Sequence, residues 1–150
     1  MTKPSDMALT HREYLNKVSK TPHAKKLKLA LISSEDNSVT LKLPFSDEII
    51  GDPINRIVHG GAISSLVDTA CGAAVFLTQN NLRAFATLDL RIDHIRAANS
   101  GEDIYATAEC YRLTHTIAFV RATVFTDNIS NPIAASIATF MRSNKQFPVN

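Results

Sequence analysis

The chain has little cysteine and little net charge. Its 150 residues include two cysteines, Cys71 and Cys110, too few for the disulfide framework of a small secreted domain. Both fall within apolar patterns, so we expect two small core residues in a protein of a reducing compartment, the cytoplasm. The 16 Lys and Arg against 14 Asp and Glu leave a net charge of +2, which is too small to indicate a nucleic-acid-binding protein.

The chain also lacks a hydrophobic run that we would expect to cross a membrane. Its N-terminus is polar, without the apolar core of a secretory signal. The apolar stretch Ala62–Leu77 is shorter than the about 20 residues that a span requires, and it holds Asp68 near its middle. The five histidines are scattered, with no acid cluster at metal-ligand spacing. We therefore expect a soluble protein with no membrane partner and no bound metal.

The most informative segment runs from His59 to Leu77 and reads HGGAISSLVDTACGAAVFL. After two glycines nearly every residue is apolar or small, which predicts a helix buried on most sides. Asp68 is the only charged residue between His59 and Leu82, and a buried carboxylate is costly unless it is paired, hydrogen-bonded or functional. The glycines leave N–H groups open at the positive end of the helix, where an oxyanion would be stabilised. Acid and donors in one segment indicate acyl chemistry.

The spacing within this segment predicts a homodimer. Asp68 follows His59 by nine residues, which is about 13 Å along a helix and about half a turn around it. The helix start and Asp68 therefore cannot reach one small reacting centre within a single chain. Two antiparallel copies would place Asp68 of one chain beside His59 and Gly60 of the other. We expect a site at a dimer interface, and a tetramer built from such dimers is compatible with it.

The rest of the chain predicts one domain over residues 1–150, with an N-terminal helix and loop in residues 1–25. The helix should cover about residues 6–19, end at Thr21-Pro22 and pack through Met7, Tyr14, Leu15 and Val18. Alternating or apolar runs predict six strands, two before the long helix and four after it. They are Leu27–Ser33, Val39–Phe45, Phe85–Ile95, Ile104–Leu113, Ile117–Thr126 and Ile133–Met141.

A helix that is apolar nearly all round needs cover on most sides. The last four strands follow one another through short turns, which is simplest as an antiparallel meander. A strongly curved antiparallel sheet wrapped around a long central helix supplies the cover. The predicted fold class is therefore α+β, and this architecture is the hotdog fold.

Two segments resemble the PaaI-like branch of the hotdog thioesterases, relatives of 4-hydroxybenzoyl-CoA thioesterase. They are VHGGAISSLVDTACGAA (58–74) and TLDLRIDHIRAANSGEDI (87–104), within a resemblance that covers about residues 38–143. The resemblance implies an acyl-CoA thioesterase that needs no cofactor, since coenzyme A is part of its substrate. It also implies a homo-oligomer, a dimer or tetramer.

The resemblance assigns roles to five residues. Asp68 matches the acid that acts as nucleophile or general base, and Gly60 matches the backbone N–H that polarises the thioester carbonyl. His59 matches the histidine that helps to hold the thioester and the loop. Thr87 matches a hydroxyl position near the catalytic acid, and Arg96 lies where family members often approach the CoA phosphates.

Three further residues are candidate substrate contacts. Gly61 belongs to the helix entry, Ser65 lies on the helix without the strand-and-elbow setting of a serine nucleophile, and His115 lies in a turn. Plainer structural roles stay open for several residues: a capping or paired acid for Asp68, a helix-entry residue for His59, and a structural role for His94 on β-patterned sequence.

The chain departs from the family pattern at two points. Many members carry an asparagine six positions before the histidine, where this chain has Pro53, and a glycine-arginine pair where it has Thr114-His115. The departure at Pro53 supports one alternative function, a non-catalytic acyl-CoA-binding protein. Another alternative is a hotdog dehydratase or hydratase, although its proline-containing loop pattern is not found in this sequence.

Overall fold

The computed structural model describes residues 4–98 and 100–146. In chain order its helices and strands are α1 (Pro4–Val18), α2 (Pro22–Lys26), β1 (Ala30–Glu35), β2 (Ser38–Leu43), the 3-10 helix η1 (Asp47–Ile49), β3 (Ile50–Asp52), β4 (Ile57–Val58), α3 (Gly60–Thr78), β5 (Arg83–His94), β6 (Ile104–Leu113), β7 (Ile117–Phe125) and β8 (Ala134–Gln146).

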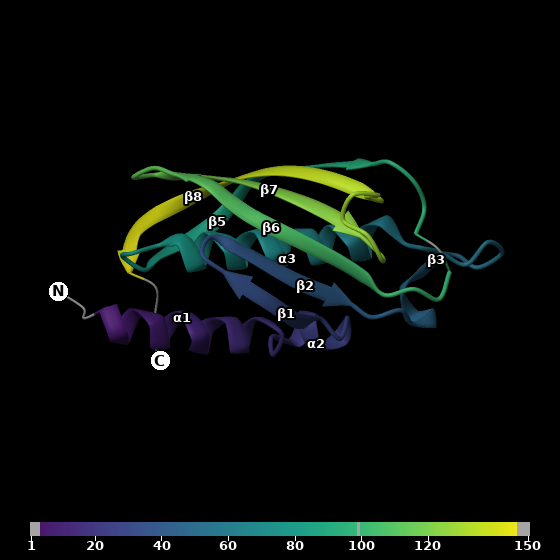
Figure 1. Cartoon of the computed structure of the whole chain (residues 1–150), viewed down its shortest axis with the longest axis horizontal. Helices are drawn as coiled ribbons and strands as arrows, with labels where there is room; N and C mark the ends of the chain where they lie inside the picture. Colours follow the sequence, from purple (N-terminus) through teal and green to yellow (C-terminus); the bar gives the residue numbers. More distant parts are fainter. Residues whose placement is uncertain (1–3, 99, 147–150) are drawn as a thin grey trace.

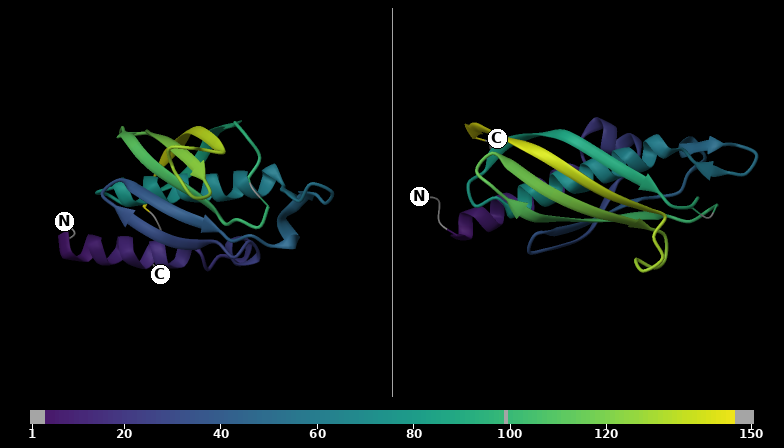
Figure 2. Two further views of the ribbon diagram at one scale, coloured as in Figure 1. Left: turned by 45° about the vertical axis from the view of Figure 1, so that its right-hand side comes forward. Right: turned by 90° about the horizontal axis from the view of Figure 1, so that it is seen from above.

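Six strands form one antiparallel sheet in the order β1-β2-β6-β7-β8-β5. The sheet curves around α3, which runs along its concave side (Figures 1 and 2). This arrangement confirms the predicted α+β class and hotdog fold. The predicted four-strand meander is wrong in one respect, because β5 pairs with β8 instead of β6. The connection between β5 and β6 carries the chain across, so that β5 covers the side of α3 opposite β1 and β2.

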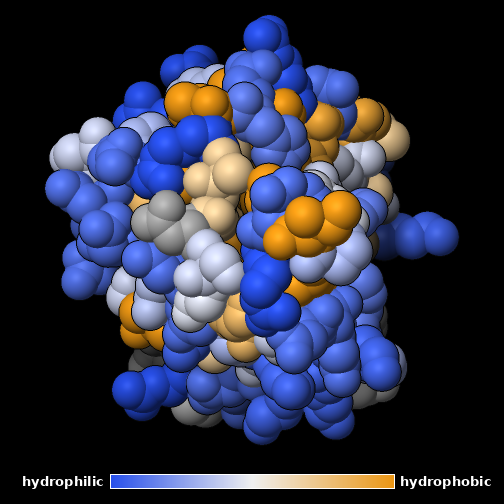
Figure 3. Space-filling model, turned by 90° about the vertical axis from the view of Figure 1, so that its right-hand side faces the viewer, coloured by the Kyte–Doolittle hydropathy of each residue, from blue (hydrophilic) through white to orange (hydrophobic). Residues whose placement is uncertain are grey.

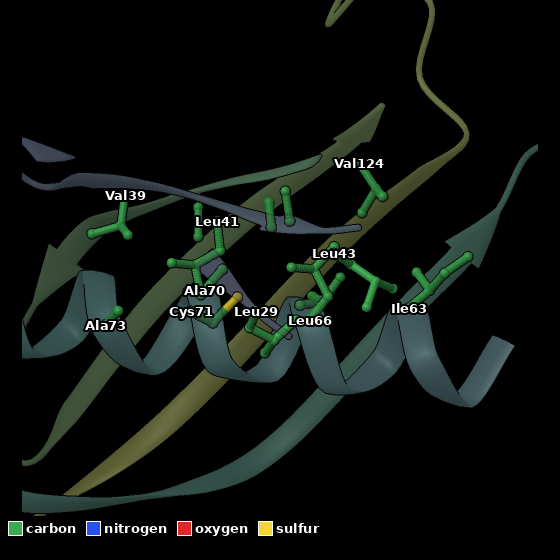
Figure 4. Packing of buried hydrophobic residues seen from close by; sticks show 14 of the residues in the cluster. Leu29, Val39, Leu41, Leu43, Ile63, Leu66, Ala70, Cys71, Ala73 and Val124 are labelled. Atoms are coloured by element: carbon green, nitrogen blue, oxygen red, sulfur yellow. The ribbon is translucent and has the colours of Figure 1, made fainter. Parts of the chain in front are cut away.

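The core lies between α3 and the concave face of the sheet. Leu66, Val67 and Ala70 of α3 are fully buried. Leu66 and Ala70 lie close to Leu43 and Leu41 of β2 (Figure 4). On β2 the buried positions Val39, Leu41 and Leu43 alternate with half-buried ones, as predicted. Burial of each large side chain of this kind contributes about 1.5 to 3 kcal/mol. Cys71 and Cys110 are both buried core residues without a disulfide, also as predicted.

One face of α3 is less covered than the sequence predicts. Ser64, Ser65, Asp68 and Thr69 are half-buried, because the sheet wraps only part of the helix circumference. By length and composition α3 could cross a membrane, contrary to our reading of residues 62–77. It is mostly buried in the fold, however, as the core helix of a soluble protein would be. The small and polar stripe on α3 is therefore available for contact with a substrate or a second chain.

The N-terminal segment contains a second helix that the sequence analysis missed. α1 ends at Val18, and the Thr21 hydroxyl then accepts a hydrogen bond from Ala24 N at 3.3 Å and caps α2. Leu15 and Val18 are buried, and the Tyr14 ring stacks on Phe76 of α3 with a centroid distance of 3.6 Å. The packing predicted for these residues is confirmed. The side chain of Met7 lies outside the described part of the chain.

The segment between β2 and α3, residues 46–58, is more ordered than a simple loop. It holds η1 and a short hairpin of β3 and β4 that leads directly into α3. This hairpin projects at the end of the molecule where α3 begins (Figure 1). Viewed from that end, the surface is mainly hydrophilic, and its hydrophobic residues are divided among several small areas (Figure 3). The start of α3 thus lies at a polar end of the molecule.

Candidate functional site

The first turn of α3 leaves one backbone donor open. His59 is the N-cap residue, and its Nδ1 accepts a hydrogen bond from Gly61 N at 2.8 Å. The carbonyl of His59 accepts from Ala62 N at 3.0 Å. Gly60 N–H has no hydrogen-bond partner among the described residues, and it lies at the positive end of a helix of 19 residues. The open donor at this helix end is therefore Gly60, the residue that the resemblance assigns to the oxyanion.

The glycines around His59 are required by close approach. A Cβ on Gly61 would stand 2.9 Å from His59 Nδ1, and a Cβ on Gly51 of β3 would stand 2.9 Å from His59 Cα. The His59 backbone N–H donates to Ile49 O at 2.8 Å, which ties the helix start to the hairpin. Because its Nδ1 is used in capping, His59 acts in this structure as the residue that holds the helix entry.

Asp68 lies two turns further along α3 and contacts the sheet. Its Oδ1 accepts a hydrogen bond of 2.8 Å from the Thr87 hydroxyl of β5. In a strand that alternated regularly, Thr87 would lie on the face opposite Leu90 and Ile92. An irregularity in the β5–β8 register between Thr87 and Asp89 changes the alternation and directs Thr87 toward the helix. The structure therefore brings the acid and the predicted hydroxyl together within one chain.

A pocket of about 450 Å³ opens beside this pair. Asp68, Thr69 and Gly72 form its helix wall, and the other walls come from α1, the Thr21 turn, β5 and β8. The remaining lining residues are Tyr14, Lys17, Val18, Thr21, Phe85, Ala86, Thr87 and Phe140. A half-buried carboxylate thus borders a chamber whose far wall is largely aromatic and aliphatic. This arrangement suits an apolar group attached to a reactive polar one.

The sequence analysis did not find most of this pocket. Phe85 and Phe140 are ordinary strand residues in the sequence, and Gly72 is one small residue in a helix rich in them. The rings of Phe85 and Phe140 meet edge to face with a centroid distance of 5.9 Å, and a Cβ on Gly72 would lie 3.4 Å from Phe85. Four segments distant in sequence build the chamber, so no local pattern in the sequence indicates it.

Within one chain the structure does not bring Gly60 and Asp68 together. They are eight residues apart on one continuous helix, a separation of about 12 Å along its axis. The fold therefore keeps this donor and this acid too far apart to act together within one chain, which is the basis of the predicted shared site.

The other candidate residues are bonded within the chain. Ser65 Oγ donates to Gly61 O at 3.1 Å and lies 3.1 Å from Nε2 of His23 on α2. Arg96 donates to Asn131 O at 2.8 Å and braces the connection after β5. His115 Nε2 lies 3.3 Å from the guanidinium of Arg83. Arg96 follows the end of β5, whereas His115 contacts its beginning, so these two are not brought together.

Asp52 and Asn55, the polar residues beside Pro53, belong to the tip of the β3–β4 hairpin. Asp52 accepts hydrogen bonds from the Asn55 side chain at 2.8 Å and from Ile54 N at 2.9 Å. The hydrogen bond from the Asn55 side chain is the largest cause of a lowered pKa at Asp52, and the backbone bonds add to it. Because the Asn55 amide is used in the turn, it does not take the place of the asparagine common in the family.

Neither cysteine is suited to act as a nucleophile. Burial raises the pKa of the Cys71 thiol to about 12, and the charge of Asp68 adds to the effect. Burial also raises the pKa of Cys110. Since the thiolate is the reactive form, burial makes both thiols poorer nucleophiles. Asp68 is thus the ionisable group that α3 presents to the pocket.

Comparison with known proteins agrees with this fold. The family model of the thioesterase superfamily matches residues 55–133, more than half of the chain. A solved protein of Pseudomonas aeruginosa is 37% identical, with 91% of this chain and 99% of that chain covered and a TM-score of 0.77. A protein of Halobacterium salinarum described as a candidate esterase is 29% identical over 103 residues, 67% of each chain.

Two solved structures that are less similar in sequence share the fold. The Escherichia coli PaaI protein from the phenylacetic acid degradation operon is 18% identical, covers 97% of this chain and 100% of its own, and has a TM-score of 0.81. A Streptococcus mutans protein bound to acetyl-CoA is 20% identical, covers 79% of this chain and 91% of its own, and has a TM-score of 0.69. Together with the family match, these likenesses establish that the chain belongs to the thioesterase superfamily and has a PaaI-like hotdog fold.

Proposed function

We propose that the protein hydrolyses an acyl-CoA thioester to a free acid and CoA, at a site shared between two chains of a homodimer. The observation that carries the proposal is the half-buried Asp68 carboxylate, held by Thr87 at the wall of a 450 Å³ pocket. Membership of the thioesterase superfamily supports the reaction class. A carboxylate near the reacting carbon can remove a proton from water or attack directly, and the position of Asp68 at the pocket wall supports both roles.

The reaction needs a donor for the oxygen that becomes negative. The thioester carbonyl oxygen accepts from the open Gly60 N–H of one chain, and Asp68 of the partner subunit acts on the carbonyl carbon. In the general-base route, Asp68 takes a proton from water while the water oxygen bonds to carbon. The C–S bond then breaks, and CoA leaves as a thiolate that takes up a proton. The helix end stabilises the intermediate oxyanion.

Asp68 can also act as the nucleophile. In that route its free oxygen bonds to the carbonyl carbon, CoA leaves, and water hydrolyses the resulting anhydride. The Thr87 bond to Oδ1 leaves Oδ2 open for either route.

The acyl group occupies the pocket, and CoA extends over the polar end of the molecule. The pocket is large enough for a small aromatic or a short aliphatic acyl group, because it falls within the range of pockets that hold small molecules. The similar Streptococcus mutans fold was solved with acetyl-CoA, which supports a CoA ester as the ligand. Arg96, His115, Ser65 and Gly61 remain candidate substrate contacts in this proposal. We place the reaction in the cytoplasm and propose no metal or redox cofactor.

The test uses a panel of acyl-CoA esters that differ in chain length and aromatic content. Hydrolysis of each ester is measured by the release of free thiol. Asp68→Asn keeps the shape and the Thr87 contact but removes the charge, so kcat should fall by at least about a hundredfold. Asp89 is an exposed acid on β5, the strand that also carries Thr87. Asp89→Asn is therefore the matched control and should keep wild-type rates. Equal rates in Asp68→Asn and the wild type would refute the assignment.

A second candidate is a non-catalytic acyl-CoA-binding protein. It is favoured by Pro53 and by the use of the Asn55 amide in the hairpin turn, which leaves the site without the family's usual asparagine. Calorimetric titration with the same esters separates the two functions. Tight binding without release of thiol from any ester would select the binding protein.

A further inference from the structure

His94 lies at the end of β5 beside the open donor of α3. It is the last residue of β5, pairs in register with Ala134 of β8, and its side chain is exposed. A methyl group on Gly60 would stand 3.7 Å from both Cε1 and Nε2 of His94. The outer edge of the imidazole, with Nε2, therefore faces Gly60 across a space that a methyl group would fill.

The His94 ring differs from the other histidines in its hydrogen bonding. His11 Nε2 bonds to Gln79 O, His23 to Ser65, His59 to Gly61 N, and His115 to Arg83. Within residues 4–98 and 100–146, neither ring nitrogen of His94 has a hydrogen-bond partner. Among these histidines, His94 alone has both ring nitrogens available to a ligand.

The neighbourhood supplies a reason for this open nitrogen. Gly60 N–H, the open donor of the helix start, belongs to the residue that the His94 ring faces. An oxyanion hole needs donors about 2.7 to 3.1 Å from the oxygen, and it commonly combines a backbone N–H with a side-chain donor. A neutral imidazole with its proton on Nε2 is such a donor.

We propose that His94 is the second donor of the oxyanion hole: its Nε2–H and the Gly60 N–H bind the same thioester carbonyl oxygen. This inference rests on the proposed thioester hydrolysis. It makes His94 a catalytic residue, since it touches the reacting oxygen, and it gives His59 the separate task of capping the helix. The sequence analysis left a structural role open for His94, because a β-patterned run does not show where its strand ends. In the structure β5 ends at His94, beside the first residue of α3.

Two substitutions separate donation from space-filling. His94→Gln places an amide nitrogen near the position of Nε2 and keeps a donor, whereas His94→Phe keeps the ring shape and removes it. We expect His94→Phe to lower kcat by at least about tenfold with KM changed by less than about twofold, because the bond strengthens in the transition state. His94→Gln should keep kcat within about threefold of the wild type.

Asp93→Asn is the matched control, since this exposed neighbour on β5 is paired with Arg91. Its kcat should equal that of the wild type, and all variants should share the wild-type unfolding temperature. Wild-type kcat in His94→Phe would overturn the inference, as would equal loss in His94→Phe and His94→Gln, or a rise in KM alone. If the wild-type protein itself releases no thiol from any ester, the proposed function fails instead.

Discussion

The Thr87 hydroxyl donates a 2.8 Å hydrogen bond to Oδ1 of Asp68. This bond joins β5 to the middle of α3 and fixes one carboxylate oxygen at the pocket wall. It exists because the sheet register shifts beside Thr87, so that the side chain faces the helix. In the proposed reaction the Asp68 carboxylate must keep one orientation to act at a fixed carbon, and the Thr87 hydroxyl is the group that would hold it.

Thr87→Val should lower kcat by about tenfold, the effect of a lost hydrogen bond of about 1.4 kcal/mol to a charged group. Valine keeps the shape and the β propensity of threonine, so the fold should survive. Thr87→Ser retains the hydroxyl and should recover most of the rate. Steady-state kinetics of the three proteins on one ester measure the difference, and a Thr87→Val enzyme as fast as Thr87→Ser would show that the bond has no role in turnover.

The local part of the site could be predicted from the sequence. His59, the glycines and Asp68 lie on one short segment, and the period of the helix alone fixes their separation. The structure places each of them as that period requires, with Gly60 N–H open and Asp68 on the less covered face. The curved sheet also followed from the sequence, since a helix as apolar as α3 must be covered.

The non-local part could not be predicted. Pairing of β5 with β8 depends on which sheet edge is free after the other strands have paired, and local alternation does not contain that information. The shift beside Thr87 reverses the expected face of one residue, and a one-residue change in register has this effect on any strand. The position of His94 beside Gly60 follows from the same long-range pairing.

Mixed dimers test whether the site is shared. Gly60→Ala keeps the backbone N–H but adds a methyl group that should crowd the thioester carbonyl bound there. The backbone should not be strained, because a Cβ at this position meets only His94 at 3.7 Å and Gly60 does not have positive φ. Asp68→Asn impairs the acid. In a heterodimer of the two variants, a shared arrangement gives one site with both defects and one intact site.

Random pairing makes half of the dimers heterodimers, so the mixture should recover up to roughly one quarter of wild-type activity. If both groups act within one chain, every site stays damaged and mixing recovers nothing. Native mass spectrometry confirms that heterodimers have formed. Sedimentation of the wild type should show a dimer or tetramer at micromolar concentration, and an active monomer would contradict the shared site directly.

The pocket wall predicts a size limit for the acyl group. Gly72 is buried in α3, and a Cβ there would be 3.4 Å from Phe85 and 3.8 Å from Phe140, which are ordinary contact distances. Gly72→Ala should therefore fold, and replacing glycine inside a helix should raise stability by up to about 1 kcal/mol. The added methyl group narrows the chamber next to Asp68 and Thr87. The kcat/KM should fall more for larger acyl groups than for smaller ones, because only the larger groups reach this part of the pocket.

We expect kcat/KM of Gly72→Ala to fall by at least about tenfold for the largest ester that the wild type accepts, the scale of one misfitting methyl group in an apolar pocket. The value for acetyl-CoA should stay within about twofold, which makes this ester the internal control. Gly72→Val should extend the loss to shorter chains, so the size limit should move in steps with the volume of the side chain. An equal loss on every ester would show instead that the substitution displaces Asp68, and an unchanged profile would place the acyl group outside the pocket.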